Sequence, residues 1–341
     1  MIRPGPRNLI TDVDGISVGN AEDPRARTGV TVVLPHDRAV ASGDVRGAAP
    51  GTRETDLLDP TCRIDRIDGV CFSGGSVHGL ASADAVVSWL HERGRGFFIN
   101  GEHLPIIPGA IIYDLPMGGA KDWGRCPNYA DLARAACDSA GLDFPLGNIG
   151  AGMGASAGPL KAGLGSASAV CEDGLQVGAL VVSNPFGAAT MPGGGTLWAW
   201  ALERNGEMGG QHVPGPVNHR EDIVSQDGQL GGNTTLAVIA TNGTLDKAQA
   251  KRIAMMAHDG MARAIRPIHT PFDGDVVFTL STTQLPLADP DSRSVARIGA
   301  IAADCLTRAI GRSLFEAAAL GDFPSYRESH AGAFADGGNL G

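Results

Sequence analysis

The sequence has no cluster of lysine and arginine residues and no apolar run long enough to cross a membrane. Its 341 residues carry 27 Lys and Arg against 37 Asp and Glu, a net charge of -10. Since nucleic-acid-binding surfaces are normally basic, this balance argues against a nucleic-acid partner. The first residues lack the apolar stretch of a secretory signal, so we expect a cytoplasmic protein without a membrane partner.

Motifs for thiol, nucleotide and metal chemistry are also missing. The six cysteines are scattered without C-x-x-C or metal-like spacing, which predicts reduced and mostly packed thiols. The glycine-rich segment 147–158 lacks the G-K-[ST] ending of a phosphate-binding P-loop. No oxygen ligands at EF-hand spacing follow the Asp-Gly-Asp sequence at 273–275. We therefore expect neither a metal ion nor an organic cofactor.

The chain does contain alternating strand and helix patterns, which predict an α/β fold of one large domain or two smaller ones. Short apolar runs predict strands at residues 29–35, 69–72, 110–113 and 177–182. Apolar spacing of 3.6 residues predicts helices at about 81–93, 129–140, 245–265 and 292–310, the last of which is expected to continue beyond residue 310. Thr244 is the predicted N-cap of the third helix.

A Gly-Gly-Asn-Thr-Thr sequence at 231–235 precedes an apolar strand pattern and suggests self-cleavage. The hydroxyl of Thr234 can attack the carbonyl group of Asn233, and hydrolysis of the resulting ester would make Thr234 a new N-terminus. A threonine paired with its own α-amine is a recognised activated nucleophile. That amine titrates near about pH 7.7 to 8.0, which suits a general base. The alternative is an ordinary turn that leads into a strand.

Two carboxylates, Asp273 and Asp275, lie two residues apart just before the strand pattern of residues 276–280. If they begin that strand, both side chains point to one face, where their repulsion raises one pKa unless a cation lies between them. The ammonium group of a freed Thr234 would be such a cation. A solvated surface turn is the alternative interpretation.

Asn184 ends another apolar strand pattern, and its amide can donate a hydrogen bond to a developing oxyanion. An ordinary Asn-Pro turn is the alternative at that position. Lys161 follows the glycine-rich segment and is either a cation of the site or an exposed loop charge.

These segments together resemble the self-processing L-aminopeptidase/D-amidase-esterase family. The resemblance rests on residues 9–20, 28–33, 74–80, 231–235 and 272–275, and it spans nearly the whole chain in order. The Asn-Thr junction and the Asp-Gly-Asp pair are most similar to the nylon-oligomer (6-aminohexanoate oligomer) hydrolase branch of that family.

The resemblance implies a four-layered α/β/β/α sandwich, similar to N-terminal-nucleophile hydrolases and to ornithine acetyltransferase. It implies a single hydrolase domain, 1–341, cleaved between Asn233 and Thr234 into chains 1–233 and 234–341. The processed heterodimers are expected to assemble into homo-oligomers such as tetramers.

The same resemblance implies the roles of the site residues. Thr234 would be nucleophile and base, Asp273 and Asp275 would hold it, and Asn184 would stabilise the oxyanion. Tyr113 and Lys161 would line the pocket. The predicted reaction is hydrolysis of amide bonds in short peptides or small linear amides through an acyl-ester intermediate. An acyltransferase and a non-catalytic ligand-binding protein are the alternatives.

Overall fold

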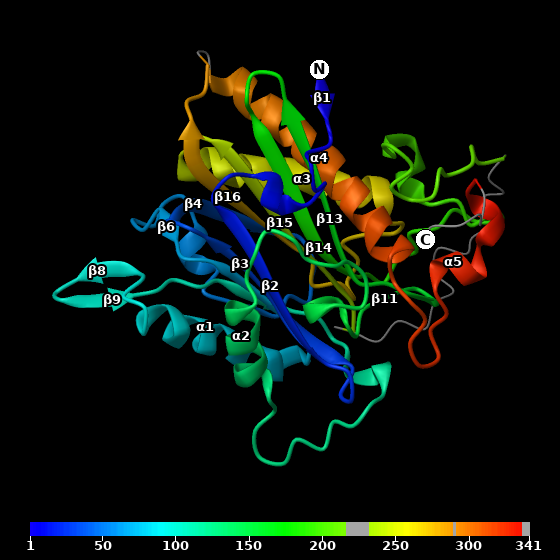
Figure 1. The fold of residues 1–341 in the computed structure, drawn as a ribbon, viewed down its shortest axis with the longest axis horizontal. Helices are drawn as coiled ribbons and strands as arrows, with labels where there is room; N and C mark the ends of the chain where they lie inside the picture. Colours follow the sequence, from blue (N-terminus) through cyan, green and yellow to red (C-terminus); the bar gives the residue numbers. More distant parts are fainter. Residues whose placement is uncertain (216–231, 289–290, 336–341) are drawn as a thin grey trace.

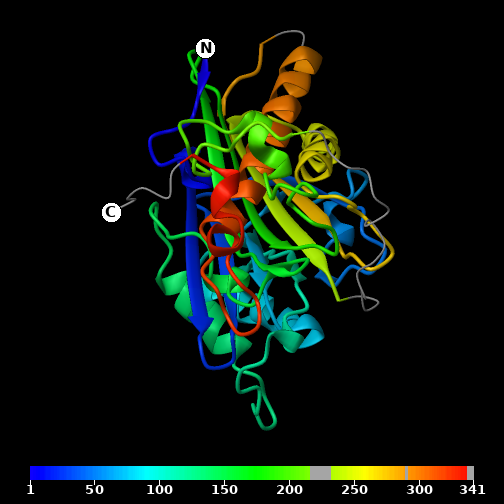
Figure 2. The ribbon, with the colours of Figure 1, turned by 90° about the vertical axis from the view of Figure 1, so that its right-hand side faces the viewer.

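The structure, a computed structural model, describes residues 1–215, 232–288 and 291–335. Gly231 of the predicted cleavage motif lies outside the described residues. Two β-sheets pack face to face, and helices cover their outer faces (Figures 1 and 2). The layers follow one another as helices α1 and α2, the small sheet, the large sheet, and helices α3 and α4. The expected α/β/β/α sandwich is therefore confirmed.

The large sheet has seven strands and carries the predicted cleavage site. Their order is β1 (Ile2–Arg3), β13 (Leu164–Cys171), β14 (Gln176–Asn184), β15 (Thr234–Gly243), β16 (Val276–Leu285), β4 (Ala39–Val45) and β6 (Arg66–Ile67). Neighbours pair antiparallel except β15 and β16, which are parallel.

The small sheet has five strands. Their order is β2 (Ile16–Asp23), β3 (Thr28–Pro35), β7 (Val70–Ser73), β10 (Gly109–Ile111) and β5 (Thr52–Arg53). Two short hairpins lie outside both sheets, β8 (Phe97–Ile99) with β9 (Glu102–Leu104), and β11 (Ser156–Ala157) with β12 (Leu160–Lys161).

Five α-helices lie within the described residues: α1 (Ser82–His91), α2 (Tyr129–Asp138), α3 (Lys247–Ala264), α4 (Asp291–Phe315) and α5 (Tyr326–Ser329). Short 3-10 turns occur at Ile10–Asp12, Asp56–Leu58, Ser76–Ala81, Leu115–Met117, Gly150–Gly152, Trp198–Leu202 and Ala331–Ala333. Of the helices in the described ranges, none is long and apolar enough to cross a membrane.

The N-terminus of α3 corrects one sequence prediction. The N-cap is Asp246 and not Thr244, because the Asp246 side chain accepts a hydrogen bond from the Gln249 N–H. The Gln249 side chain in turn accepts from the Asp246 N–H at 2.9 Å, which completes a capping box. The aspartate thus satisfies a backbone donor of the first turn, and Thr244 lies two residues outside the helix.

Three apolar clusters fill the spaces between the four layers. On β15, Val238 belongs to the cluster between the sheets, whereas Ile239 faces α3 and α4. Because both faces of this strand are buried, its middle residues 236–240 form a continuous apolar run and do not alternate with polar residues.

The strand order brings three polar chain segments to one end of the large sheet. Asn184, the last residue of β14, pairs with Thr234, the first residue of β15. On the other side of β15, Asn233 forms a parallel bridge with Asp273, three residues before β16 begins. The predicted strand therefore starts after Asp275, and both aspartates lie in the segment that leads into it.

Candidate active site

Thr234 is buried at the start of β15, with only 3% of its surface exposed. Its hydroxyl donates a hydrogen bond to the carbonyl oxygen of Asn233, the residue before it. The predicted nucleophile therefore lies beside the peptide bond that it is expected to attack.

The carbonyl group of Asn233 also accepts a hydrogen bond from the backbone N–H of Gly274, at 3.0 Å. Such a donor polarises the carbonyl and stabilises negative charge on its oxygen. Glycine fits at this position because a Cβ atom would lie 2.9 Å from Thr234 Oγ1 and 2.6 Å from the carbonyl oxygen of Ala49. The sequence analysis did not assign Gly274 a role, although the Asp-Gly-Asp motif contains it.

Asp273 is fully buried and accepts three hydrogen bonds. The Phe186 N–H donates to Oδ1 at 2.9 Å, while the N–H and the hydroxyl of Thr270 donate to Oδ2 at 2.9 and 2.5 Å. Burial raises the pKa of Asp273, and the negative charge of Asp275 raises it further. The solvated-turn alternative is excluded for this residue.

Asp275 is fully buried as well, and its two oxygens have different partners. Oδ1 accepts from the N–H of Thr235 at 2.7 Å. Oδ2 accepts from the backbone N–H and the ring Nδ1 of His269, at 3.1 and 2.8 Å. This carboxylate therefore connects the peptide group that follows Thr234 to the segment before β16.

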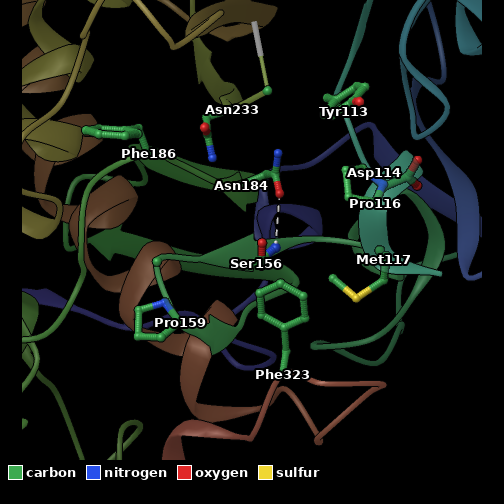
Figure 3. A pocket seen from close by; sticks show the side chains of 13 residues that line it. Tyr113, Asp114, Pro116, Met117, Ser156, Pro159, Asn184, Phe186, Asn233 and Phe323 are labelled. Atoms are coloured by element: carbon green, nitrogen blue, oxygen red, sulfur yellow. Dashed lines mark hydrogen bonds between the residues drawn. The ribbon is translucent and has the colours of Figure 1, made fainter. Parts of the chain in front are cut away.

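The side chain of Asn184 is oriented by a hydrogen bond to its amide oxygen. Its Oδ1 accepts from the Ser156 N–H at 3.0 Å (dashed in Figure 3), whereas the buried Nδ2 has no hydrogen-bond partner among the residues that the structure describes. The residue lines a cavity of about 490 Å³, so the amide N–H groups are available to an oxygen bound there. This geometry suits a donor to an oxyanion.

Polar and apolar side chains together line the cavity. Tyr113, Asn184 and Asn233 lie toward the top of Figure 3, and Phe323 and Pro159 lie toward the bottom. Tyr113 follows β10 and is half-buried. The structure thus brings the predicted Tyr113 and the predicted cleavage residue Asn233 to the same cavity. Apolar side chains form much of the remaining wall, namely Pro116, Met117, Pro159, Phe186 and Phe323.

Lys161 lies behind this wall and is not among the lining residues. It is fully buried, which excludes the exposed-loop alternative. Its Nζ donates to the carbonyl groups of Ala155 at 2.8 Å, Gly152 at 3.3 Å and Ala162. Three acceptors match the three donors of an ammonium group. Burial lowers the pKa of Lys161 to about 7, and the charge of Asp114 opposes that shift.

The contacts of Lys161 hold the chain segment that orients Asn184. Ser156, whose N–H binds Asn184, pairs with Lys161 across the β11–β12 hairpin.

Asp114 is a residue of the cavity that was not identified from the sequence. Its buried carboxylate lines the cavity and accepts hydrogen bonds from Thr28 Oγ1 at 2.6 Å and the Gly75 N–H at 2.7 Å. Within the described ranges, no group of three or more His, Cys, Asp or Glu residues is placed to hold a metal ion.

Comparisons with known proteins show which family the chain belongs to. The sequence profile of peptidase family S58 matches residues 8–325. An uncharacterized aminopeptidase of Mycobacterium tuberculosis is 43% identical, over 96% of this chain and 99% of the relative. The 6-aminohexanoate-oligomer endohydrolase of Kocuria sp. is 30% identical, over 90% of this chain and 86% of the relative.

Solved structures share the fold at lower sequence identity. The β-aminopeptidase from Burkholderia sp. superposes with a TM-score of 0.68 at 23% identity, covering 93% of this chain and 89% of that one. The L-aminopeptidase D-Ala-esterase/amidase from Ochrobactrum anthropi, described as a variant of the Ntn hydrolase fold, gives 0.67 at 23% identity, covering 92% and 88%. The chain therefore belongs to peptidase family S58 and is a hydrolase of amide bonds.

Proposed function

We propose that this hydrolase activates itself by cutting the Asn233–Thr234 peptide bond and then uses Thr234 to hydrolyse small linear amides. The observation that carries the proposal is the contact between the buried Thr234 hydroxyl and the Asn233 carbonyl group. The Gly274 N–H, 3.0 Å from the same carbonyl oxygen, supports it because this donor stabilises the charge that attack would create.

Self-cleavage proceeds by an N-to-O acyl shift. Thr234 Oγ attacks the Asn233 carbonyl carbon and loses its proton, and the tetrahedral intermediate then breaks its C–N bond. The amide nitrogen takes up a proton and becomes the α-amine of Thr234, while the acyl group of Asn233 forms an ester with Oγ. Water hydrolyses this ester, which leaves a carboxylate on Asn233 and a free hydroxyl on Thr234.

Substrate hydrolysis uses the same hydroxyl. The Thr234 α-amine takes the hydroxyl proton as Oγ attacks the substrate carbonyl, and it then delivers that proton to the leaving amine. Asn184 Nδ2 and the Gly274 N–H donate to the oxyanion. Water finally hydrolyses the acyl ester. The loss of one oxyanion donor typically raises the barrier by about 2.7 to 4 kcal/mol.

The walls of the cavity favour a short substrate with an uncharged, apolar body. Phe186, Met117 and Phe323 supply apolar surface next to the amide group of Asn184. One relative is named an uncharacterized aminopeptidase, and another is named a 6-aminohexanoate-oligomer endohydrolase. We therefore propose aminoacyl amides and linear amide oligomers as the substrates to test first.

The experiment compares two adjacent threonines. Thr235 is fully buried and its hydroxyl has no hydrogen-bond partner in the described part of the chain, so Thr235→Val removes a hydroxyl of no proposed function. Thr234→Val makes the same change at the proposed nucleophile. Intact mass measures self-cleavage, and release of amine from an aminoacyl p-nitroanilide and from 6-aminohexanoate oligomers measures hydrolysis.

We expect Thr234→Val to stay a single 341-residue chain without activity, and Thr235→Val to cleave itself and turn over substrate as the parent does. Thr234→Ser should retain part of both reactions, since it keeps a hydroxyl. Wild-type cleavage or turnover in Thr234→Val would overturn the proposal. Product release that requires an added amine acceptor would instead identify an acyltransferase.

A further inference from the structure

His269 contacts the candidate site through a single carboxylate oxygen. Its backbone N–H and its ring Nδ1 lie 3.1 and 2.8 Å from Asp275 Oδ2. The other oxygen of Asp275 accepts from the Thr235 N–H at 2.7 Å. The carboxylate therefore links the imidazole of His269 to the peptide group directly after Thr234. This peptide group joins Thr234 to the rest of β15, so its position fixes the orientation of Thr234.

The ring of His269 is held in place from its other side by a second histidine. The two rings meet edge to face, with centroids 4.8 Å apart and an interplanar angle of 76°. His258 is 2% exposed, and its Nε2 lies 3.1 Å from the carbonyl oxygen of Asp44. Burial lowers the pKa of His258 to about 4, so this ring is neutral near pH 7.

The tautomer of the His269 ring follows from its hydrogen-bond partner, the Asp275 carboxylate. An ionised carboxylate only accepts hydrogen bonds, so the Nδ1 atom must carry the proton that is shared with Asp275. The Nε2 atom is buried and has no partner within the described residues. The imidazole thus makes one side-chain hydrogen bond, and that bond is directed at Asp275.

The backbone of His269 adopts a conformation that few side chains tolerate. Its φ angle is +56°, in the left-handed region that glycine and asparagine occupy most readily. With this φ angle, the N–H and the ring of His269 reach the same oxygen. A residue in this region keeps its conformation only where the surrounding structure holds it, here through the two contacts with Asp275 Oδ2.

We propose that His269 is a positioning residue, which holds the Asp275 carboxylate and through it the peptide group of Thr235 and the orientation of Thr234. The inference rests on the proposed function, because it assigns His269 a part in a reaction at Thr234. His269 does not line the substrate cavity, so its loss should lower kcat and leave KM nearly unchanged.

Two substitutions separate the hydrogen bond from the backbone strain. Glycine and asparagine both accept the left-handed conformation, but only asparagine offers an N–H donor at the distance of Nδ1 from the Cα atom. We would compare His269→Gly with His269→Asn and measure thermal midpoint, rate of self-cleavage, kcat and KM. The kcat values are divided by the amount of protein that carries a Thr234 N-terminus, so incomplete processing does not lower them.

We expect His269→Gly to lose at least about tenfold in kcat, equivalent to 1.4 kcal/mol, with KM within about twofold. His269→Asn should recover most of that loss at a similar thermal midpoint. Wild-type kcat in His269→Gly, or equal losses in both variants, would overturn the inference alone. Failure of the parent chain to cleave itself and hydrolyse amides would instead overturn the proposed function.

Discussion

At the scale of single residues, the two buried carboxyl groups beside Thr234 differ in their electrostatic environment. Asp275 accepts hydrogen bonds from three N–H groups, one of Thr235 and two of His269. Burial raises the pKa of Asp273, and the negative charge of Asp275 raises it further. An ammonium group formed at Thr234 by self-cleavage would lower this repulsion, because a cation between two carboxylates favours their charged forms.

Replacement of either aspartate by asparagine should therefore slow catalysis more than it destabilises the fold. We expect Asp273→Asn and Asp275→Asn each to reduce self-cleavage and amide hydrolysis at least about tenfold, a loss of about 1.4 kcal/mol in transition-state stabilisation. Asp304→Asn is the control, since Asp304 is 41% exposed and pairs only with Arg263 among the described residues. Its rates should match the parent. Parental rates in both site variants would remove the pair from the mechanism.

The polar residues that the sequence predicts are those with a recognisable local pattern. Asn184 and Thr234 stand at the ends of apolar runs, and the fold makes them register partners. Ser156 and His269 have no such pattern, because their contacts join segments that are distant in sequence or depend on an unusual φ angle. Lys161 was predicted at the pocket, and only the fold shows that three carbonyl groups hold it behind the wall.

At the scale of elements, α3 and α4 cover the outer face of the large sheet and approach each other closely at Gly260. A Cβ atom there would lie 2.3 Å from the backbone carbonyl oxygen of Ala303, an atom that cannot move aside. Gly299, on α4, differs because its Cβ atom would meet the side chain of Met256, which can take another rotamer.

This contrast makes a prediction about stability. Alanine normally stabilises a helix interior by about 1 kcal/mol relative to glycine. Gly299→Ala should keep part of this gain, whereas Gly260→Ala should lower the free energy of unfolding by about 1 to 3 kcal/mol through overpacking. Thermal midpoints of the two variants, compared with the parent, measure the difference. A Gly260→Ala variant as stable as Gly299→Ala would contradict the close helix contact.

Helices with a clear 3.6-residue period and strands with an uninterrupted apolar run were predictable, whereas two-residue strands were not. The helical periodicity at residues 245–265 and 292–310 corresponds to α3 and α4. Helix α4 ends at Phe315. Strands such as β5 and β6 have two residues each, too few for any periodic pattern. The N-cap of α3 was wrong by two residues because Thr244 and Asp246 are both good capping residues, and only the hydrogen bond to Gln249 distinguishes them.

At the scale of the whole molecule, the proposed cut falls at the start of a central strand, between two stretches that each supply part of the site. Asn184 and Tyr113 would remain on the chain 1–233, whereas Thr234, Asp273 and Asp275 would lie on 234–341. The two chains would stay together, because β15 pairs with β14 over eight residue pairs in the same sheet. Assembly of such heterodimers into tetramers stays a prediction, as does a cytoplasmic location.

The most direct measurement of the central claim is the intact mass of the purified parent chain during incubation at neutral pH, with N-terminal sequencing of its products. From the share of residues in the 35.0 kDa chain, we predict fragments of about 24 kDa and about 11 kDa, the smaller beginning with Thr234. A single 35.0 kDa species after prolonged incubation, with no Thr234 N-terminus, would contradict self-activation.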